Sequence, residues 1–276
     1  MDTLLLKKAV ELKKESNSDV LIASVNSKKA LKFFEAIQDT NLVIVTHNKG
    51  LLKKDLEVPV VLMPINILGI KKRISLAIAA ALETEAVEEG YTVVFVEDTD
   101  KYRHISIIKV EEGGDQEMYK FLSKSRDIDP EVIYSVLEIA KELGLKGREG
   151  DPVGSTFIIG DSGNVMRRSI QITYNPFESS FIKVKDPVVK SMLKEYSRLD
   201  GAFVIGDDGR VISAARYLES RKNDIEMPKG LGARHISAAY TTKVTDSIAI
   251  VLSESDKIIR IFSKGRLVLE VDPEEL

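Results

Sequence analysis

The sequence predicts an α/β fold in two domains, a small, mostly parallel sheet domain followed by a mixed-sheet domain. Helical and strand patterns alternate through residues 1–110, as they do in βαβ units. From residue 155 onward, short apolar strands dominate instead. The length of 276 residues fits two domains of ordinary size, and we expect them to span residues 1–125 and 126–276.

The first domain begins with an amphipathic helix and continues with short apolar runs that suit a parallel sheet. Ser27 directly follows a strand, and its hydroxyl can cap the next helix by accepting a hydrogen bond from a free backbone amide. The expected elements are helices over 2–15, 27–37 and 71–88 and strands over 20–25, 42–45, 58–63, 92–96 and 105–110. Residues 111–127 contain two adjacent glycines and are expected to be mainly a connection, with room for a short helix over 117–123.

The second domain opens on a helix whose two ends are marked in the sequence. Asp129 is the expected N-cap and Pro130 occupies the first turn, while Gly144 and Gly147 mark the end. Further along the chain, strands are expected over 157–159, 203–205, 211–215, 248–252 and 258–262, and helices over 187–196 and 235–243. This order of elements predicts a mixed sheet.

Composition and charge argue against several classes of protein. The 40 Lys and Arg nearly balance the 43 Asp and Glu, so the chain lacks the basic surface of a dedicated nucleic-acid binder. The absence of cysteine excludes disulfides, thiolate chemistry and zinc fingers. The longest apolar runs are too short, or too interrupted by proline, for a membrane span of about 20 residues. We therefore expect a soluble, cytoplasmic protein with no nucleic-acid or membrane partner.

Asp200 and Gly201 stand at the mouth of the expected strand over 203–205. A carboxylate in this place can reach a ligand that lies across the strand ends, and it can bind a divalent cation because Mg²⁺ and Mn²⁺ prefer oxygen ligands. The alternative is an ordinary Asp-Gly turn, in which the aspartate bonds its own backbone.

A Gly-rich loop over residues 229–232 leads into a helix that begins with Arg234 and His235. The arrangement suits a phosphate group, because glycine lets backbone amides approach an anion and arginine can clamp it with two hydrogen bonds. The loop matches neither the Walker nor the Rossmann fingerprint, so a plain turn remains the alternative. A third polar segment, Ser253 and Glu254, either forms a hairpin turn or faces the same cleft as this loop.

As a set, these segments resemble the motifs of the diadenylate cyclase (DAC) domain, with Asp-Gly-Ala at 200–202, Gly-Ala-Arg-His-Ile-Ser-Ala at 232–238 and Ser-Glu at 253–254. The resemblance implies an enzyme that condenses two ATP molecules into cyclic di-AMP and two pyrophosphates, each ribose 3′-hydroxyl attacking an α-phosphate. It also implies dependence on Mn²⁺ or Mg²⁺. Since each site of the family holds one ATP, it implies a homo-oligomer in which catalytic domains face each other.

The resemblance assigns roles to the matching positions. Asp200, Arg234 and His235 are the expected catalytic residues, and Asp200 and His235 are the expected metal ligands. The alternative for His235 is a histidine that only stabilises the start of its helix. The ATP-binding positions that the resemblance implies are Gly201, Ala202, Leu218, Gly232, Ala233, Arg234, His235, Ser237, Ser253 and Glu254.

Two positions depart from the family pattern. Many members carry a threonine before the Arg-His pair and a second arginine after it, where this chain has Ala233 and Ile236. A hydroxyl and a positive charge are therefore missing from the expected phosphate site. The departures leave open a non-catalytic sensor of ATP or cyclic dinucleotides, and a scaffold protein built on two α/β domains is the remaining alternative.

The first domain resembles the C-terminal domain of pyruvate kinase, as in archaeal-type cyclases whose catalytic domain follows an α/β domain. The features that carry this resemblance are a strand that runs into Asn26 and Ser27 and a second strand that ends at His47 and Asn48. It implies a regulatory or oligomerising domain. A regulatory domain could bind a small anionic effector at the helix start at Asn26 and Ser27, and the alternative is a plain packing domain.

Overall fold

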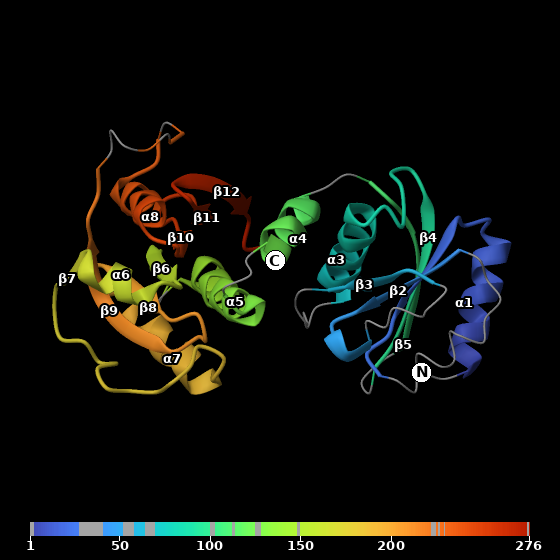
Figure 1. The fold of residues 1–276 in the computed structure, drawn as a ribbon, viewed down its shortest axis with the longest axis horizontal. Helices are drawn as coiled ribbons and strands as arrows, with labels where there is room; N and C mark the ends of the chain where they lie inside the picture. The colour runs from blue at the N-terminus through green and yellow to red at the C-terminus, as the bar shows by residue number, and fades with distance from the viewer. Residues whose placement is uncertain are drawn as a thin grey trace. The chain divides into compact units, whose positions relative to one another are not determined.

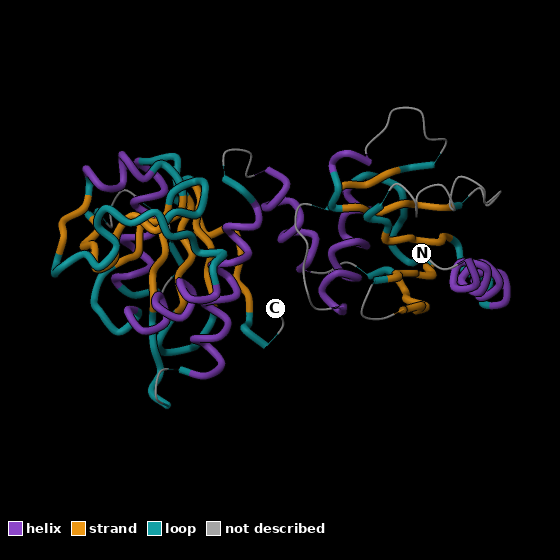
Figure 2. The backbone as a smooth tube through the Cα atoms, turned by 90° about the horizontal axis from the view of Figure 1, so that it is seen from below, coloured by secondary structure: helices purple, strands orange, loops and turns teal. Residues whose placement is uncertain are grey.

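The fold consists of two compact units, Met1–Ser123 and Lys124–Leu276, each with its own sheet (Figure 1). The computed structural model describes residues 3–27, 41–51, 58–63, 70–99, 103–111, 114–124, 128–147, 150–221, 225, 227–228, 230–274 and 276. In both units, strands lie at the centre and helices cover them (Figure 2). None of the described helices combines the length and the apolar character that crossing a bilayer requires.

Unit 1 is built on a five-stranded sheet of order β3-β2-β1-β4-β5. Its strands are β1 (Val20–Ser24), β2 (Leu42–Thr46), β3 (Val60–Leu62), β4 (Thr92–Asp98) and β5 (Arg103–Lys109), and its helices are α1 (Thr3–Glu15), α3 (Ile70–Glu83) and α4 (Gly114–Lys124), with a 3-10 turn η1 (Lys49–Leu51). Strands β3, β2, β1 and β4 are parallel to one another, and β5 runs antiparallel to β4. The prediction of a mostly parallel sheet is confirmed. Helices α1 and α3 cover opposite faces of this sheet (Figure 1).

Two helices of unit 1 differ from their expected bounds, and a third expected helix lies outside the described residues. Helix α3 ends at Glu83 and not at residue 88, because Glu85 adopts φ +57° and the chain closes with a bond from the Ala86 amide to the Ala81 carbonyl, a Schellman ending without glycine. Helix α4 spans 11 residues where mainly a connection was expected. The helix expected over 27–37 lies outside the described residues apart from Ser27.

Unit 2 is built on a seven-stranded sheet of order β12-β11-β10-β6-β8-β9-β7. Its elements are α5 (Pro130–Lys146), β6 (Ser155–Ile159), α6 (Ser162–Arg167), β7 (Ser169–Gln171), α7 (Pro187–Tyr196), β8 (Ala202–Ile205), β9 (Val211–Leu218), α8 (Ala233–Val244), β10 (Ile248–Leu252), β11 (Ile259–Ser263) and β12 (Arg266–Val271). Strands β6 and β8 are parallel, whereas the other described pairs are antiparallel. The prediction of a mixed sheet is confirmed, and α6, β7 and β12 were not anticipated.

Local sequence signals set the ends of the helices in unit 2. The Asp129 side chain accepts the Glu131 amide at 3.0 Å and so caps α5, while the Gly147 amide closes the helix by donating to the Leu143 carbonyl at 2.8 Å. Helix α8 packs on the sheet face that β10 and β11 share. Its residues Ala238 and Ala239 lie in one buried cluster with side chains of β6, β8, β9 and β10. This packing fixes where the first turn of α8 meets the sheet.

Candidate active site

Strand register brings distant segments of unit 2 to one edge of the sheet. Ala202 at the start of β8 pairs with Thr156 in β6 and with Arg216 in β9. Leu252 at the end of β10 pairs with Ser155 at the start of β6. The first residues of β6 and β8 and the last residues of β9 and β10 therefore lie along the same edge.

Asp200 and Gly201 form the turn that enters β8 at this edge. The Asp200 side chain is exposed, and its Oδ1 atom accepts the Gly201 amide at 2.9 Å. Gly201 has φ +100°, and a Cβ there would lie 2.8 Å from the carbonyl carbon of Ala215 and from the amide nitrogen of Arg216. Only glycine fits such a place without strain. The turn bond and the exposed carboxylate, considered as alternatives from the sequence, thus occur together.

An ion pair between Arg234 and Glu254 links the start of the helix after the Gly-rich loop to the hairpin after β10. The Nη1 atom of Arg234 lies 3.0 Å from Oε2 of Glu254, and the two side chains are 41% and 57% exposed. A Cβ on Gly154, just before β6, would clash with the guanidinium of Arg234. An exposed ion pair of this kind contributes about 0–1 kcal/mol to stability.

The start of α8 presents small residues and backbone to solvent. Gly232 is the N-cap, it provides no side-chain cap, and a Cβ added to it would meet no atom within 4 Å. Ala233 is also exposed. The Ser237 hydroxyl donates to the Arg234 carbonyl at 3.1 Å. Because the first turn of a helix carries unsatisfied amides and positive potential, this surface suits an anion.

His235 lies in the interior and not at the surface of the site. It is 6% exposed, its ring meets Phe262 edge-on at 6.1 Å, and the described residues offer neither ring nitrogen a hydrogen-bond partner. Burial lowers the pKa of His235, and the positive charge of Arg260 lowers it further, so the neutral form is favoured. Within the described part of the chain, His235 thus packs in the interior without the hydrogen bonds expected of a histidine that stabilises a helix start, and its role as a metal ligand stays a prediction.

Ala202 and Leu218 are almost fully buried, 2% and 6% exposed, in the apolar cluster that α8 covers. Ser253 is buried as well, and its amide donates to the Ile258 carbonyl at 3.1 Å, which closes the β10–β11 hairpin. Among the described residues, no group of three or more His, Cys, Asp or Glu gathers as a metal cluster would. Asp200 offers a cation an exposed carboxylate.

Two residues beside the site were not predicted. Gly154 leaves room for the Arg234–Glu254 pair, and its position just before a strand was the available signal. Arg260 in β11 forms ion pairs with Asp256 and Glu270. The sequence feature that could have singled out Arg260 is a charged residue inside an otherwise apolar strand.

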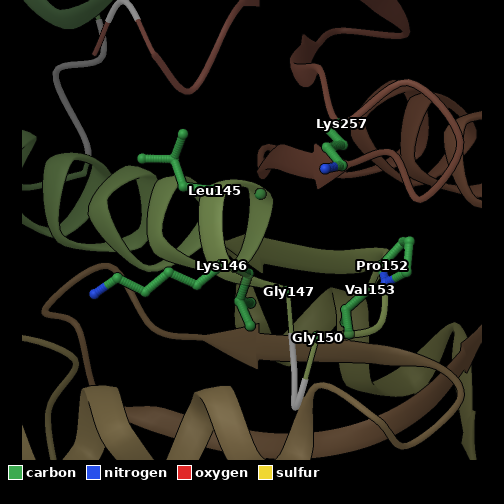
Figure 3. Close-up of a pocket in the computed structure, with 9 residues that line it drawn as sticks. Leu145, Lys146, Gly147, Gly150, Pro152, Val153 and Lys257 are labelled. Carbon is green, nitrogen blue, oxygen red and sulfur yellow. The ribbon is translucent and has the colours of Figure 1, made fainter.

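A cavity of about 100 Å³ lies near the C-terminal end of α5 (Figure 3). Its lining includes Gly147, Gly150, Pro152 and Val153, with Lys257 on another side. None of its lining residues is among the predicted site residues, and the cavity carries no part of the argument on function.

Comparison with known proteins follows the division into two units. The family described as DisA bacterial checkpoint controller nucleotide-binding (DAC) matches residues 142–267. A second family, described as the probable sensor domain DacZ_T, matches residues 1–113. The DAC match includes the three motif segments of the sheet edge.

Solved structures similar to this chain have low sequence identity to it. DacA from Staphylococcus aureus is 20% identical, covers 52% of this chain and 89% of its own, and superposes with a TM-score of 0.38. A pyruvate kinase from Cryptosporidium parvum is 19% identical over 39% of this chain and 22% of its own, with a TM-score of 0.34. Scores this low carry no argument, so the pyruvate kinase-like character of unit 1 stays a prediction.

Curated relatives are much closer in sequence. A diadenylate cyclase from Haloferax volcanii is 46% identical over 217 residues, which cover 77% of this chain and 79% of the relative. A diadenylate cyclase from Methanocaldococcus jannaschii is 38% identical over 205 residues, which cover 72% of this chain and 66% of the relative. Identity at this level over most of the length shows that the chain belongs to the diadenylate cyclase family of enzymes.

Proposed function

We propose that this enzyme condenses two ATP molecules into cyclic di-AMP and two pyrophosphates. The observation that supports the proposal is the strand register that brings Asp200 and Glu254 to one sheet edge, where Glu254 pairs with Arg234 at the start of α8. In each half of the reaction, the 3′-oxygen of one ATP bonds to the α-phosphorus of the other. The bond from that phosphorus to the pyrophosphate oxygen breaks, and the 3′-hydroxyl loses its proton.

Phosphate binding is the part of the reaction to which the start of α8 is suited. The guanidinium of Arg234 and the amides of the first helical turn supply positive charge for a triphosphate, while Gly232 and Ala233 leave the backbone accessible. Glu254 holds Arg234 in place through their ion pair. Positioning and charge stabilisation supply most of the catalysis in phosphoryl transfer, so no covalent nucleophile is needed.

Asp200 is the proposed residue for the 3′-hydroxyl and for a Mn²⁺ or Mg²⁺ ion. Its exposed carboxylate fits a cation that takes most of its ligands from phosphates and water, which is how Mg²⁺ usually binds in nucleotide sites. Such an ion would neutralise charge on the phosphates. The burial of His235 makes it a poor candidate for the same ion.

The proposal also covers how the enzyme assembles and which part of it is regulatory. Each site holds one ATP, so two catalytic units face each other in a homo-oligomer and an isolated monomer is inactive. Because ATP is the substrate, the proposed location is the cytoplasm. Unit 1, which matches a family described as a probable sensor domain, is the proposed regulatory part.

Turnover of ATP with Mn²⁺ or Mg²⁺, with products separated by chromatography and identified by mass, tests the proposal. Wild type and Asp208→Asn are expected to make cyclic di-AMP, and Asp200→Asn is not. Asp208 is a matched control because it is also an exposed aspartate of unit 2, paired with Lys183. Full activity of Asp200→Asn would refute its role, and ATP that binds without conversion would indicate a sensor.

A further inference from the structure

The β10–β11 hairpin, which carries Glu254, is held at its base by Arg260. The Arg260 side chain is 9% exposed and lies between two carboxylates. Its Nη2 and Nη1 atoms lie 2.7 and 3.2 Å from the two carboxylate oxygens of Asp256, and its Nε lies 2.6 Å from Oε1 of Glu270 in β12. One guanidinium thus ties the turn to two strands of the sheet.

Asp256 is the attachment point inside the turn. Besides Arg260, its Oδ1 accepts the Ile258 amide at 3.1 Å. The hydrogen bonds from Arg260, and then from Ser253, hold the pKa of Asp256 well below its usual range despite burial, so it stays charged. Burial lowers the pKa of Arg260, but hydrogen bonds to Asp256 and Glu270 outweigh burial and raise it overall. Both members of the pair are therefore ionised at any ordinary pH.

Glu254 depends on this turn for its position. It lies two residues before Asp256, and its side chain is 57% exposed, with Arg234 at 3.0 Å. An exposed pair of flexible side chains does not fix its own geometry, because ordering them opposes the small Coulomb gain. The backbone around Glu254 must instead be fixed by the turn, whose shape the Asp256–Arg260 pair sets.

We propose that Arg260 is a positioning residue for ATP binding. By holding Asp256 it fixes the turn so that Glu254 meets Arg234, and Arg234 in turn is presented to the triphosphate. Arg260 itself is buried between Asp256 and Glu270, so it acts on the site through the turn. The inference rests on the proposed function, because it assigns a role to a residue behind that same phosphate site.

A double-mutant cycle separates this role from a purely structural one. The variants are Arg260→Met, Glu254→Gln and the double variant, each measured for KM and kcat with ATP and for melting temperature. Alone, Arg260→Met should raise KM roughly tenfold, about the value of one charge-assisted hydrogen bond, with a smaller change in kcat. With Glu254→Gln already present, it should raise KM by less than about twofold, because the ion pair it acts through is gone.

Arg210→Met is the matched control. Arg210 lies in the same unit, where it bonds the Ser180 carbonyl at 2.8 Å and stacks on Phe181. Its loss should lower the melting temperature while KM stays the same in both backgrounds. If Arg260→Met does not fold, Arg260→Lys replaces it in the cycle, because lysine keeps the charge but loses the bidentate grip on Asp256.

The outcomes distinguish this inference from the proposed function. An equal rise in KM in both backgrounds, or a lower melting temperature with unchanged KM, would overturn the role of Arg260. If wild type makes no cyclic di-AMP, the proposed function fails. The double-mutant cycle is then measured with the Kd for ATP in place of KM, and Arg260→Met is expected to raise that Kd more in the wild-type background than in the Glu254→Gln background. A wild type that does not bind ATP would overturn both.

Discussion

At the residue scale, Gly201 shows how one backbone angle places the Asp200 carboxylate. A Cβ at φ +100° would press on the backbone of Ala215 and Arg216 at 2.8 Å. We expect Gly201→Ala to destabilise unit 2 by more than about 1 kcal/mol, seen as a lower melting temperature. Gly163→Ala is the control, since a Cβ there would meet only Arg167 at 3.9 Å. Equal melting temperatures for the two variants would contradict the strain argument.

The buried imidazole of His235 predicts a pH dependence of stability. Its pKa is lowered by burial and by Arg260, so below about pH 6.5 the unfolded chain takes up a proton that the folded chain resists. The stability that neutral His235 contributes is therefore intact above that pH. It is lost as the pH falls toward the pKa of His235 in the folded state. As the pH falls below about 6.5, the free energy of unfolding of wild type should drop, relative to that of His235→Phe, by up to about 1.4 kcal/mol per pH unit. Denaturant unfolding at several pH values measures the difference, and a difference independent of pH would contradict it.

Residue type and the family resemblance together predicted which residues share this sheet edge. Residue type singled out Asp200 and Arg234, with a plain turn as the alternative for each, and the resemblance added Glu254; the three lie at one sheet edge. The burial of His235 and the ion pairs of Arg260 could not be predicted. Both depend on packing between segments distant in sequence, with Phe262 in one case and Glu270 in the other.

At the scale of elements, α5 and α7 begin with the same device. Asp129 and Asp186 cap them by accepting the Glu131 amide at 3.0 Å and the Val188 amide at 2.8 Å. Asp129 also lies 2.7 Å from Lys185, whose side chain is 37% exposed. Asp186→Ala should cost about 1 kcal/mol, and Asp129→Ala should cost more because an ion pair is lost with the cap.

Asparagine separates the two contributions. Asp129→Asn keeps a cap oxygen but removes the charge, so its cost should lie between those of wild type and Asp129→Ala. For Asp186→Asn, almost no loss is expected. Free energies of unfolding from denaturant titration give the ranking, and equal costs for the two alanine variants would show that the Lys185 pair adds nothing.

Elements whose ends are marked by typical capping residues were predicted well, and elements without such residues were not. Helix α7 was expected over 187–196 and spans Pro187–Tyr196, because its Asp-Pro start is explicit. Helix α4 was expected mainly as a connection because adjacent glycines at its start resemble a turn, whereas its burial of Met118 and Leu122 comes from tertiary packing. Helix α3 ends at Glu83, and the left-handed angle that follows it falls on Glu85 and not on a glycine, so no residue type marked the stop.

At the scale of the whole molecule, the two units have separate apolar cores. One buried cluster joins α1 to the parallel sheet of unit 1, with Leu6, Leu21 and Ile44 among its members. Another joins α8 to the mixed sheet of unit 2, with Val204 and Ala238 among its members. Because each cluster draws on one unit only, we expect the chain to unfold in more than one step.

A perturbation confined to each unit tests this expectation. In unit 1, Glu97 is 2% exposed and accepts hydrogen bonds from Arg73 at 2.9 and 3.1 Å and from Ser24 at 2.9 Å. Glu97→Gln breaks this buried ion pair, which should destabilise unit 1 by about 3 kcal/mol. In unit 2, ATP should stabilise the folded state by mass action if the proposed site is correct.

Calorimetry of wild type and Glu97→Gln, each with and without ATP and Mg²⁺, distinguishes the two effects. We expect the substitution to lower one transition and the nucleotide to raise another, with each leaving the other transition in place. A single transition that moves with both perturbations would mean that the units unfold as one cooperative body, because stability lost in one core would then be shared by the other. Changes in unit 1 would in that case reach the ATP site through stability alone, without any separate regulatory contact.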